Sequence, residues 1–239
     1  EIHERLVGSE MCIRDRLLTD LIPDISLLIP QSYEEIKTPE TEKLLASFLT
    51  QAETSAAPKL IHMSGIPGAG KSTFYRRHRW NKHVFIGFDT IMEQLPAYRQ
   101  ELQNAGSVAA FQKWEIPARI IGYELLRRAV SLRKDIFFDH GGVTPAHVNL
   151  MKNLKNYGYA TEMYYISCTP EVAFNRALLR EQTTLRHTPR EIIEKRSQII
   201  GELLVQYKNI VDRFYAYDNR NNKYRLVESI DNLNKKEAA

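Results

Sequence analysis

The chain has 239 residues, of which 43% are hydrophobic and 26% are charged, and its formal net charge at pH 7 is +4. This composition is that of an ordinary globular protein with enough residues to bury a core, and no apolar run approaches the roughly 18 residues that a membrane-spanning helix needs. The basic excess suits a phosphate-rich small substrate but is too small to indicate nucleic-acid binding by itself.

Residues 1–16 are expected to be a scar of sequencing or assembly. Residues 6–16 resemble the translation of a transposase adapter used in sequencing libraries, and residues 1–5 would be the flanking index read in the same frame. Such a segment has no reason to pack against a folded domain. Without it, Cys168 is the only cysteine, which excludes an internal disulfide and favours a reducing compartment. We therefore expect a cytoplasmic protein.

Residues 17–58 are expected to form an N-terminal helical arm followed by a linker. The apolar residues between 44 and 49 follow a helical spacing, whereas residues 51–58 are small and polar. We expect the main domain to cover residues 59–230 and a frayed, Lys-rich tail to cover residues 231–239.

Residues 65–72 match the phosphate-binding loop pattern, with the sequence Gly-Ile-Pro-Gly-Ala-Gly-Lys-Ser. They follow a strand-like apolar run, residues 60–63, and lead into residues 73–77, which can continue as a helix. In this context backbone N–H groups and the helix N-terminus bind a phosphate anion, so the loop predicts nucleoside triphosphate binding. Lys71 can reach the outer phosphates, and the Ser72 hydroxyl can bind Mg²⁺. The expected ATP-binding residues are Gly65, Gly68, Ala69, Gly70, Lys71, Ser72 and Thr73.

Strands and helices alternate after this loop. Residues 83–88, 135–138 and 160–167 are strand-like, and one or two further strands are expected between residues 214 and 227. Helical patterns separate them, which favours an α/β fold with a parallel β-sheet of about five strands and helices on both faces. Together with the phosphate-binding loop, this alternation predicts a P-loop NTPase fold of the kinase-like type.

Prolines are expected to shape the helices of this domain. Residues 90–104 look helical, but Pro96 should break or kink them. Residues 107–132 also look helical, and Pro117 should either kink this helix or begin a second one. Threonine followed by proline is expected to begin three later helices, at Thr144, Thr169 and Thr188.

Acidic side chains follow the second and third strands, at Asp89 and Asp139. Ligands of an open parallel sheet sit at the carboxyl ends of its strands, so both carboxylates and the phosphate-binding loop are expected to converge there. Asp89 could accept the proton of an attacking hydroxyl, or it could serve only as the N-cap of a helix from Thr90. Asp139 could bind Mg²⁺, or it could be a turn aspartate before Gly141.

A polar segment with basic ends, residues 180–187, lies between two expected helices. In a phosphoryl transferase such a segment can close as a lid whose arginines, here Arg180 and Arg186, stabilise the transferred phosphate and exclude water. A solvated connection with ordinary surface arginines is the alternative. We expect a helical lid near residues 176–190.

The histidines predict no further site. His62, His78, His83 and His140 show no metal-ligand spacing, and no long basic stripe with interleaved aromatic residues indicates a nucleic-acid interface. The expected cofactors are therefore ATP and Mg²⁺, and neither a membrane nor a nucleic acid is expected as a partner.

The order of these motifs resembles the zeta toxin family. The resemblance runs from about residue 60 to about residue 217 and rests on the phosphate-binding loop, the strand that ends in Phe88-Asp89-Thr90, the strand that ends in an acid and a glycine turn, and Arg180 followed by Arg186-His187-Thr188-Pro189. Members of that family are ATP-dependent kinases. The best-known ones phosphorylate the 3′-hydroxyl of UDP-N-acetylglucosamine.

The resemblance implies roles for individual residues. Lys71 and Ser72 would hold ATP and Mg²⁺, and Asp89 would be the base on the sugar hydroxyl. Arg180 and Arg186 would clamp the transferring phosphate. The family also suggests an antitoxin protein as a partner.

The resemblance further implies a substrate-binding set, in which Asp89, Glu124 and Asp139 would contact the acceptor. Where the family has Glu-Gly-Thr after the third strand, this chain has Asp139-His140-Gly141, and the arginine that follows is replaced by Val143. The first hypothesis is a kinase of a small hydroxylated metabolite, with a nucleotide sugar as the candidate acceptor. A polynucleotide or other small-molecule kinase and a non-catalytic ATP-binding switch or toxin-like partner module are the alternatives.

Overall fold

The computed structural model describes residues 16–78, 80, 82–184 and 188–233. Apart from Arg16, the expected scar at residues 1–16 therefore lies outside the described residues. Within these ranges, no helix is both long and apolar enough to cross a membrane.

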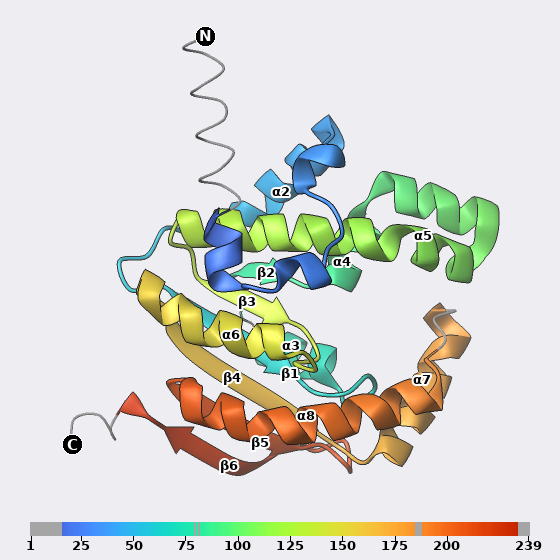
Figure 1. Ribbon diagram of the computed structural model, residues 1–239. Coiled ribbons are helices and arrows are strands. Elements are labelled where there is room, and N and C mark those ends of the chain that lie inside the picture. Colours follow the sequence, from blue (N-terminus) through green and yellow to red (C-terminus); the bar gives the residue numbers. More distant parts are fainter. Residues whose placement is uncertain (1–15, 79, 81, 185–187, 234–239) are drawn as a thin grey trace.

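A six-stranded sheet forms the centre of the fold (Figure 1). Its strands are β1 (Lys59–Ser64), β2 (Val84–Ile86), β3 (Ile136–Asp139), β4 (Ala160–Ser167), β5 (Arg213–Asp218) and β6 (Arg225–Asp231). Their order across the sheet is β2-β3-β1-β4-β5-β6, and every neighbouring pair is parallel except the antiparallel pair of β5 and β6. The predicted parallel α/β architecture is confirmed, and the last strand adds an antiparallel edge to it.

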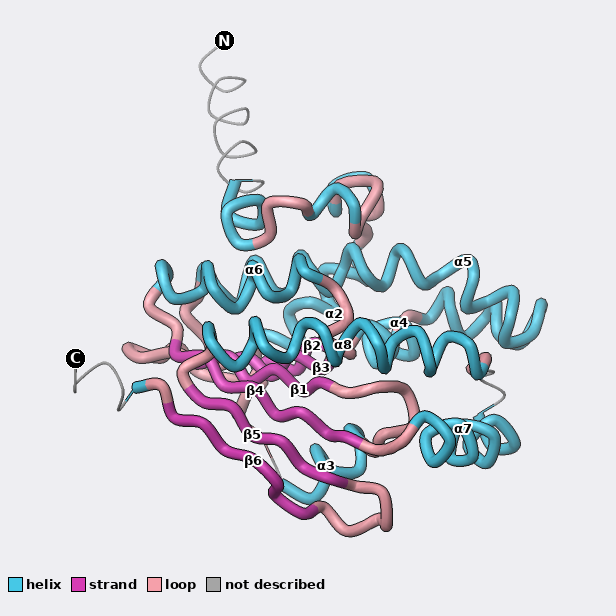
Figure 2. Tube along the Cα trace, turned by 60° about the horizontal axis from the view of Figure 1, so that its bottom comes forward, coloured by secondary structure: helices cyan, strands magenta, loops and turns pink. Residues whose placement is uncertain are grey.

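Helices cover both faces of this sheet (Figure 2). The α-helices are α2 (Pro39–Leu49), α3 (Lys71–His78), α4 (Phe88–Gln94), α5 (Pro96–Ser131), α6 (Pro145–Asn153), α7 (Pro170–Thr184) and α8 (Arg190–Ile210). Short 3₁₀ helices are η1 (Ile25–Leu27), η2 (Tyr33–Glu35) and η3 (Leu154–Tyr157), and residues 16–21 are also helical. In Figure 2, α6 and α8 lie on one face of the sheet and α3 lies on the other.

Alternating side chains of the strands pack against these two layers. Phe137 and Phe138 are neighbours in β3 and therefore point to opposite faces. The Phe137 ring lies 4.5 Å from the ring of Tyr75 in α3, and the Phe138 ring lies 5.0 Å from that of His147 in α6, measured between ring centroids. Both faces of the central strands are thus buried, as a parallel sheet between helices requires.

The N-terminal arm packs against the main domain. Arg128 of α5 donates hydrogen bonds to both carboxylate oxygens of Glu42 in α2, at 2.8 and 2.7 Å. Apolar residues of the arm that are at most 2% exposed join the same buried core as the sheet: Leu21, Ile22, Leu45 and Phe48. Within the described residues, the arm is therefore part of the folded domain.

The chain reverses at Gly106 and not at Pro117. Gly106 has φ 81° and ψ 172° inside α5, and Figure 1 shows the two helical runs on either side of it lying next to each other. Glycine takes this conformation without the steric penalty of a Cβ atom. The predicted start of a second helix at Pro117 is wrong, because Pro117 keeps a helical backbone within the second run. The predicted break at Pro96 is confirmed, since α4 ends at Gln94 and Pro96 begins α5.

Two of the three Thr-Pro pairs begin helices as predicted. Thr144 caps α6 by accepting a hydrogen bond from the backbone N–H of Ala146, and Thr169 precedes α7. The third pair differs, because α8 begins at Arg190 with Pro189 at the N-cap position. The hydroxyl of Thr188 instead accepts a hydrogen bond from Arg180 at 3.2 Å.

The C-terminal end is ordered slightly further than predicted. β6 continues to Asp231, and the side-chain amide of Asn232 donates to the carbonyls of Lys208 and Val211 at 2.8 and 2.7 Å. The rest of the expected frayed tail, residues 234–239, lies outside the described residues.

Candidate functional site

The predicted phosphate-binding loop connects β1 to α3 and depends on its glycines. Gly65, Gly68 and Gly70 have φ values of 140°, 82° and 102°, in the region that glycine adopts readily. A Cβ atom on Gly68 would lie 2.2 Å from the backbone carbonyl oxygen of Ala173 in α7, and one on Gly65 would lie 2.4 Å from that of Ile166 in β4. The loop can therefore close against α7 and β4 only because these positions lack side chains.

The connection between β5 and β6 holds the loop from outside. The Asn219 side-chain amide donates to the carbonyl of Ala69 at 2.7 Å, and the Tyr224 hydroxyl donates to the carbonyl of Gly70 at 2.8 Å. Arg176 of α7 donates to the carbonyl of Gly68 at 3.4 Å and to that of Asn219 at 2.6 Å. Sequence reasoning missed Asn219 and Tyr224, because no local pattern links them to a loop so distant in the chain.

Lys71 lies at the start of α3 with its ammonium group folded back over the loop. Its Nζ atom donates to the carbonyls of Gly65 and Ile66 at 2.8 and 3.3 Å. Burial lowers the pKa of Lys71 from its usual value, whereas the charges of Asp139 and Asp89 raise it. A phosphate beside this ammonium would supply negative charge where burial disfavours an isolated cation. The other predicted residues of α3 follow directly, with Ser72 exposed and Thr73 partly buried.

The two predicted carboxylates lie at different distances along the sheet from the phosphate-binding strand. Asp139 is the last residue of β3, directly beside β1, and pairs in register with Met63. Asp89 comes after the edge strand β2, which lies one strand further out. β2 ends at Ile86, Gly87 is the N-cap, and Asp89 lies in the first turn of α4, so it is not the N-cap of a helix from Thr90.

Arginines from α7 and α8 add positive charge near Lys71. Both Arg196 of α8 and Arg180 of α7 lower the pKa of Lys71 through their charges, after the larger effect of burial. Arg180 lies where the predicted lid was expected, although α7 remains helical up to Thr184. Arg186 lies outside the described residues. Arg196 was not predicted, because one arginine in a long amphipathic helix resembles an ordinary surface residue.

Glu124 lies in an ionic network of α5. Its carboxylate accepts hydrogen bonds from Arg127 at 2.7 Å and from Arg128 at 2.6 Å, and the residue is 8% exposed. Arg128 also binds Glu42 of the N-terminal arm. The described contacts therefore give Glu124 a structural environment, and its expected role in substrate binding stays a prediction.

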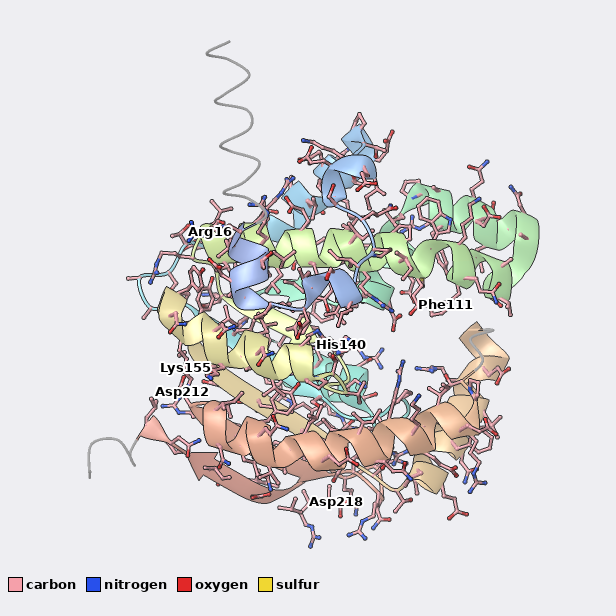
Figure 3. All side chains as sticks on the ribbon, in the orientation of Figure 1. Arg16, Phe111, His140, Lys155, Asp212 and Asp218 are labelled. Atoms are coloured by element: carbon pink, nitrogen blue, oxygen red, sulfur yellow. The ribbon has the colours of Figure 1, made fainter. Side chains whose placement is uncertain are left out.

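The turn after β3 is fastened to the phosphate-binding loop. The Ser64 hydroxyl and the backbone N–H of Gly65 both donate to the carbonyl of Gly141, at 2.8 and 3.4 Å. The backbone N–H of His140 donates to the carbonyl of Met63 at 3.3 Å. His140 lies near the centre of the molecule, close to the beginning of α6 (Figure 3). Asp139 and the phosphate-binding loop are thus parts of one connected backbone unit.

The residues present fit a nucleoside triphosphate with Mg²⁺. The three positive-φ glycines shape a loop that a Cβ atom would disturb, and Lys71 follows it at the first turn of a helix. A hydroxyl (Ser72) and a carboxylate (Asp139) supply the oxygen ligands that Mg²⁺ prefers. Ser72 and Asp139 are far apart in the sequence, and the fold brings their elements together because β3, which ends at Asp139, lies beside β1.

Comparisons with known proteins agree with this geometry. The family model described as Zeta toxin matches residues 45–230. Among solved structures, the PezAT toxin–antitoxin system of Streptococcus pneumoniae matches with a TM-score of 0.66 and 21% identity, over 81% of this chain and 82% of that one.

The AvrRxo1-ORF1:AvrRxo1-ORF2 complex also matches, in its native form and in a form with ATP among others. Its native form has a TM-score of 0.60 at 13% identity, over 81% of this chain and 68% of that one. Its form with ATP has a TM-score of 0.60 at 12% identity, over 86% of this chain and 70% of that one. A search of curated proteins gives no match. The structural likenesses establish the fold, and the family model, which spans most of the chain, shows that this protein belongs to the zeta toxin family.

Proposed function

We propose that this protein is an ATP-dependent kinase that transfers the γ-phosphate of ATP to a hydroxyl of a small metabolite. The observation that carries this proposal is the set of charges that act on Lys71: Asp139 and Asp89 at the carboxyl side of the sheet, Arg180 in α7 and Arg196 in α8. Phosphoryl transfer needs little more than positioned phosphates, a metal ion, a base and cations that stabilise the transferred group.

The phosphate-binding loop would hold the triphosphate. Backbone N–H groups of residues 65–73 and the ammonium of Lys71 would bind its oxygens, and Ser72 with Asp139 would hold Mg²⁺. When bound, Mg²⁺ neutralises charge on the phosphates. Because Gly141 binds both Ser64 and Gly65, the position of Asp139 is fixed relative to the loop.

Asp89 would act as the base. It is exposed in the first turn of α4, so an acceptor hydroxyl can approach its carboxylate from solvent. The carboxylate would accept the hydroxyl proton as the oxygen attacks the γ-phosphorus. Arg180, Arg186 and Arg196 would stabilise the charge on the transferring phosphoryl group.

The nucleoside has a candidate position beside the loop. The residues that line a pocket at the carboxyl ends of β4 and β5 include Ser167, Thr169, Asp218 and Arg220. β4 is the neighbour of β1, so a ligand whose phosphates bind the loop can extend in this direction. We assign this pocket to the base and ribose of ATP.

A nucleotide sugar such as UDP-N-acetylglucosamine is the acceptor that family membership favours. The structures similar to this chain include the PezAT toxin–antitoxin system, so an antitoxin protein is the favoured macromolecular partner. The replacement of the family's Glu-Gly-Thr by Asp139-His140-Gly141, and the presence of Val143, change the residues on the acceptor side. The acceptor should therefore be sought in a panel that also contains nucleosides, other sugars and RNA ends.

The test is transfer from labelled ATP to each member of that panel, with the product identified by mass. Asp89→Asn should lower the transfer rate by about 10²- to 10⁴-fold while ATP affinity is retained. Lys71→Met should weaken ATP binding itself. Glu93→Gln, which removes an exposed carboxylate from the next turn of the same helix, is the matched control and should leave both unchanged.

The outcome separates the kinase from the non-catalytic alternative. If Asp89→Asn transfers phosphate at the wild-type rate, Asp89 is not the base. If no acceptor in the panel is phosphorylated although ATP binds, an ATP-binding partner module becomes the better description.

A further inference from the structure

Three histidines from distant parts of the sequence meet behind the phosphate-binding loop. His62 lies in β1, His140 in the turn after β3 and His147 in α6. One ring nitrogen from each lies within 4.8 Å of the corresponding nitrogens of the other two. His62 and His147 are fully buried, and His140 is partly buried. No other His, Cys, Asp or Glu group of this kind occurs among the described residues.

The hydrogen bonds of these rings leave nitrogens without partners. His62 Nε2 lies 3.2 Å from the carbonyl oxygen of His140, and since a carbonyl can only accept, Nε2 carries the proton. The Nδ1 atom of His62 therefore presents a lone pair, and it has no hydrogen-bond partner among the described residues. His147 Nδ1 is also buried without a partner there, while its Nε2 lies 2.8 Å from the Tyr123 hydroxyl.

His140 is the third histidine of the cluster and the only one of the three that is partly exposed. Its Nδ1 accepts the backbone N–H of Gly142 at 3.3 Å, a long bond that an ion bound at Nδ1 would replace. Its ring stands edge-on to that of His147, with 4.1 Å between centroids. Ordinary aromatic packing explains these ring contacts, but it does not explain why two buried nitrogens have no partner, since buried polar groups are normally satisfied.

We propose that His62, His140 and His147 bind one divalent transition-metal ion of the zinc type. Three imidazoles are a known ligand set for zinc, with the fourth position left to water. Nitrogens around a tetrahedral zinc are about 3.4 Å apart. Since the three nitrogens now lie within 4.8 Å of one another, the rings must approach by at most about 1.4 Å. The Tyr123 hydroxyl would orient His147 from the second side of its ring, as partners of metal-bound histidines do.

This site is distinct from the Mg²⁺ site of the proposed kinase reaction, which uses oxygen ligands. It would join β1, the turn after Asp139 and α6 at one point. Because the same turn binds Ser64 and Gly65 through Gly141, the ion would stiffen the support of the phosphate-binding loop. The proposed role is therefore structural and does not depend on which acceptor the kinase uses.

The experiment uses the full chain without an affinity tag, stripped with a chelator and titrated with Zn²⁺ in the presence of millimolar Mg²⁺. Calorimetry should give one tightly bound zinc per chain, and the melting temperature should rise on zinc addition. X-ray absorption at the zinc edge should count three imidazole ligands in the wild-type protein, a result that needs no variant.

Variants assign the ion to these residues. His140→Ala and His147→Phe should each abolish the zinc-dependent rise in melting temperature, and Tyr123→Phe should weaken zinc binding about 10-fold. His78→Ala removes an exposed histidine of α3 and should bind zinc like the wild type. The proposal is overturned if the wild type binds no zinc, if the absorption spectrum shows fewer than three imidazoles, or if folded His140→Ala binds zinc unchanged. These measurements report zinc binding and not phosphate transfer, so the zinc site and the proposed kinase reaction can fail independently.

Discussion

Replacing Glu42 by glutamine should loosen the N-terminal arm from the main domain. The Glu42 carboxylate accepts hydrogen bonds from Arg128 at 2.8 and 2.7 Å and from the Tyr33 hydroxyl at 3.0 Å. The hydrogen bonds from Arg128 lower the pKa of Glu42 to about 2, against partial burial, which raises it. Glutamine keeps the shape of the side chain but loses the charge that Arg128 binds.

The pKa gives an upper limit for the loss of stability. A fall from 4.5 to about 2 corresponds to about 3.4 kcal/mol at 1.36 kcal/mol per pKa unit. Because 34% of the Glu42 side chain is exposed, solvent weakens the pair, and the expected loss is about 1–2 kcal/mol at pH 7. Since the pKa is lower in the folded state, this stabilisation is complete above pH 4.5 and is lost as the pH falls toward 2.

Urea unfolding of the wild type and Glu42→Gln at pH 7, and at steps down to pH 3, measures both effects. Glu40→Gln is the matched control, because it removes an exposed carboxylate from the first turn of the same helix and should change stability by less than about 0.5 kcal/mol. The difference between Glu42→Gln and the wild type should narrow below pH 4.5. Equal unfolding midpoints for Glu42→Gln and Glu40→Gln at pH 7 would refute the anchoring role of the ion pair.

Three further changes test other parts of the structure. Asp212→Ala should destabilise the fold by about 3 kcal/mol, because the buried carboxylate binds Lys155 (Figure 3) and also accepts a hydrogen bond from the backbone N–H of Thr161. Burial raises the pKa of Asp212, but the bonds from Lys155 and Thr161 lower it overall. The fall in melting temperature caused by Asp212→Ala should therefore be smaller at acidic pH than at pH 7. Gly68→Ala should weaken ATP binding at least about 10-fold in a calorimetric titration, since its Cβ would meet the Ala173 carbonyl. Gly201→Ala, at an exposed position of α8, should leave ATP binding unchanged and raise stability by up to about 1 kcal/mol. Arg180→Ala should lower the transfer rate by about 10³-fold with ATP affinity nearly retained, and exposed Arg190→Ala should not; equal rates for the two variants would remove Arg180 from the reaction.

Local patterns predicted the parts of the fold that depend on neighbouring residues. The phosphate-binding loop was identifiable because its glycines, Lys71 and Ser72 act within eight residues, and Thr144 begins its helix through a cap two residues away. Strand ends were placed to within one residue for β3, where the predicted acid, Asp139, is itself the last strand residue.

Contacts between distant residues were beyond these patterns. The sequence predicted that Asp89, Asp139 and the phosphate-binding loop share one edge of the sheet, but it did not predict that β3 lies between β2 and β1. Strand order is decided by packing across the whole sheet. A kink or a new helix was expected at Pro117, whereas the non-helical residue inside α5 is Gly106, whose positive φ suits glycine. The three clustered histidines have no metal-ligand spacing in the sequence, because His62 and His147 meet only when α6 packs on the sheet.

The two hydrogen bonds from Asn219 and Tyr224 to the phosphate-binding loop, here called its clamp, have a consequence for folding during translation. Asn219 holds the carbonyl of Ala69 across 150 positions of sequence, and Tyr224 holds that of Gly70. The ribosome therefore releases the nucleotide-binding loop long before the hairpin that secures it, and the loop has all these supports only after Tyr224 has been synthesised. We expect stalled nascent chains that end before Asn219 to bind ATP poorly, and tight binding by such chains would show that the loop is set without its clamp.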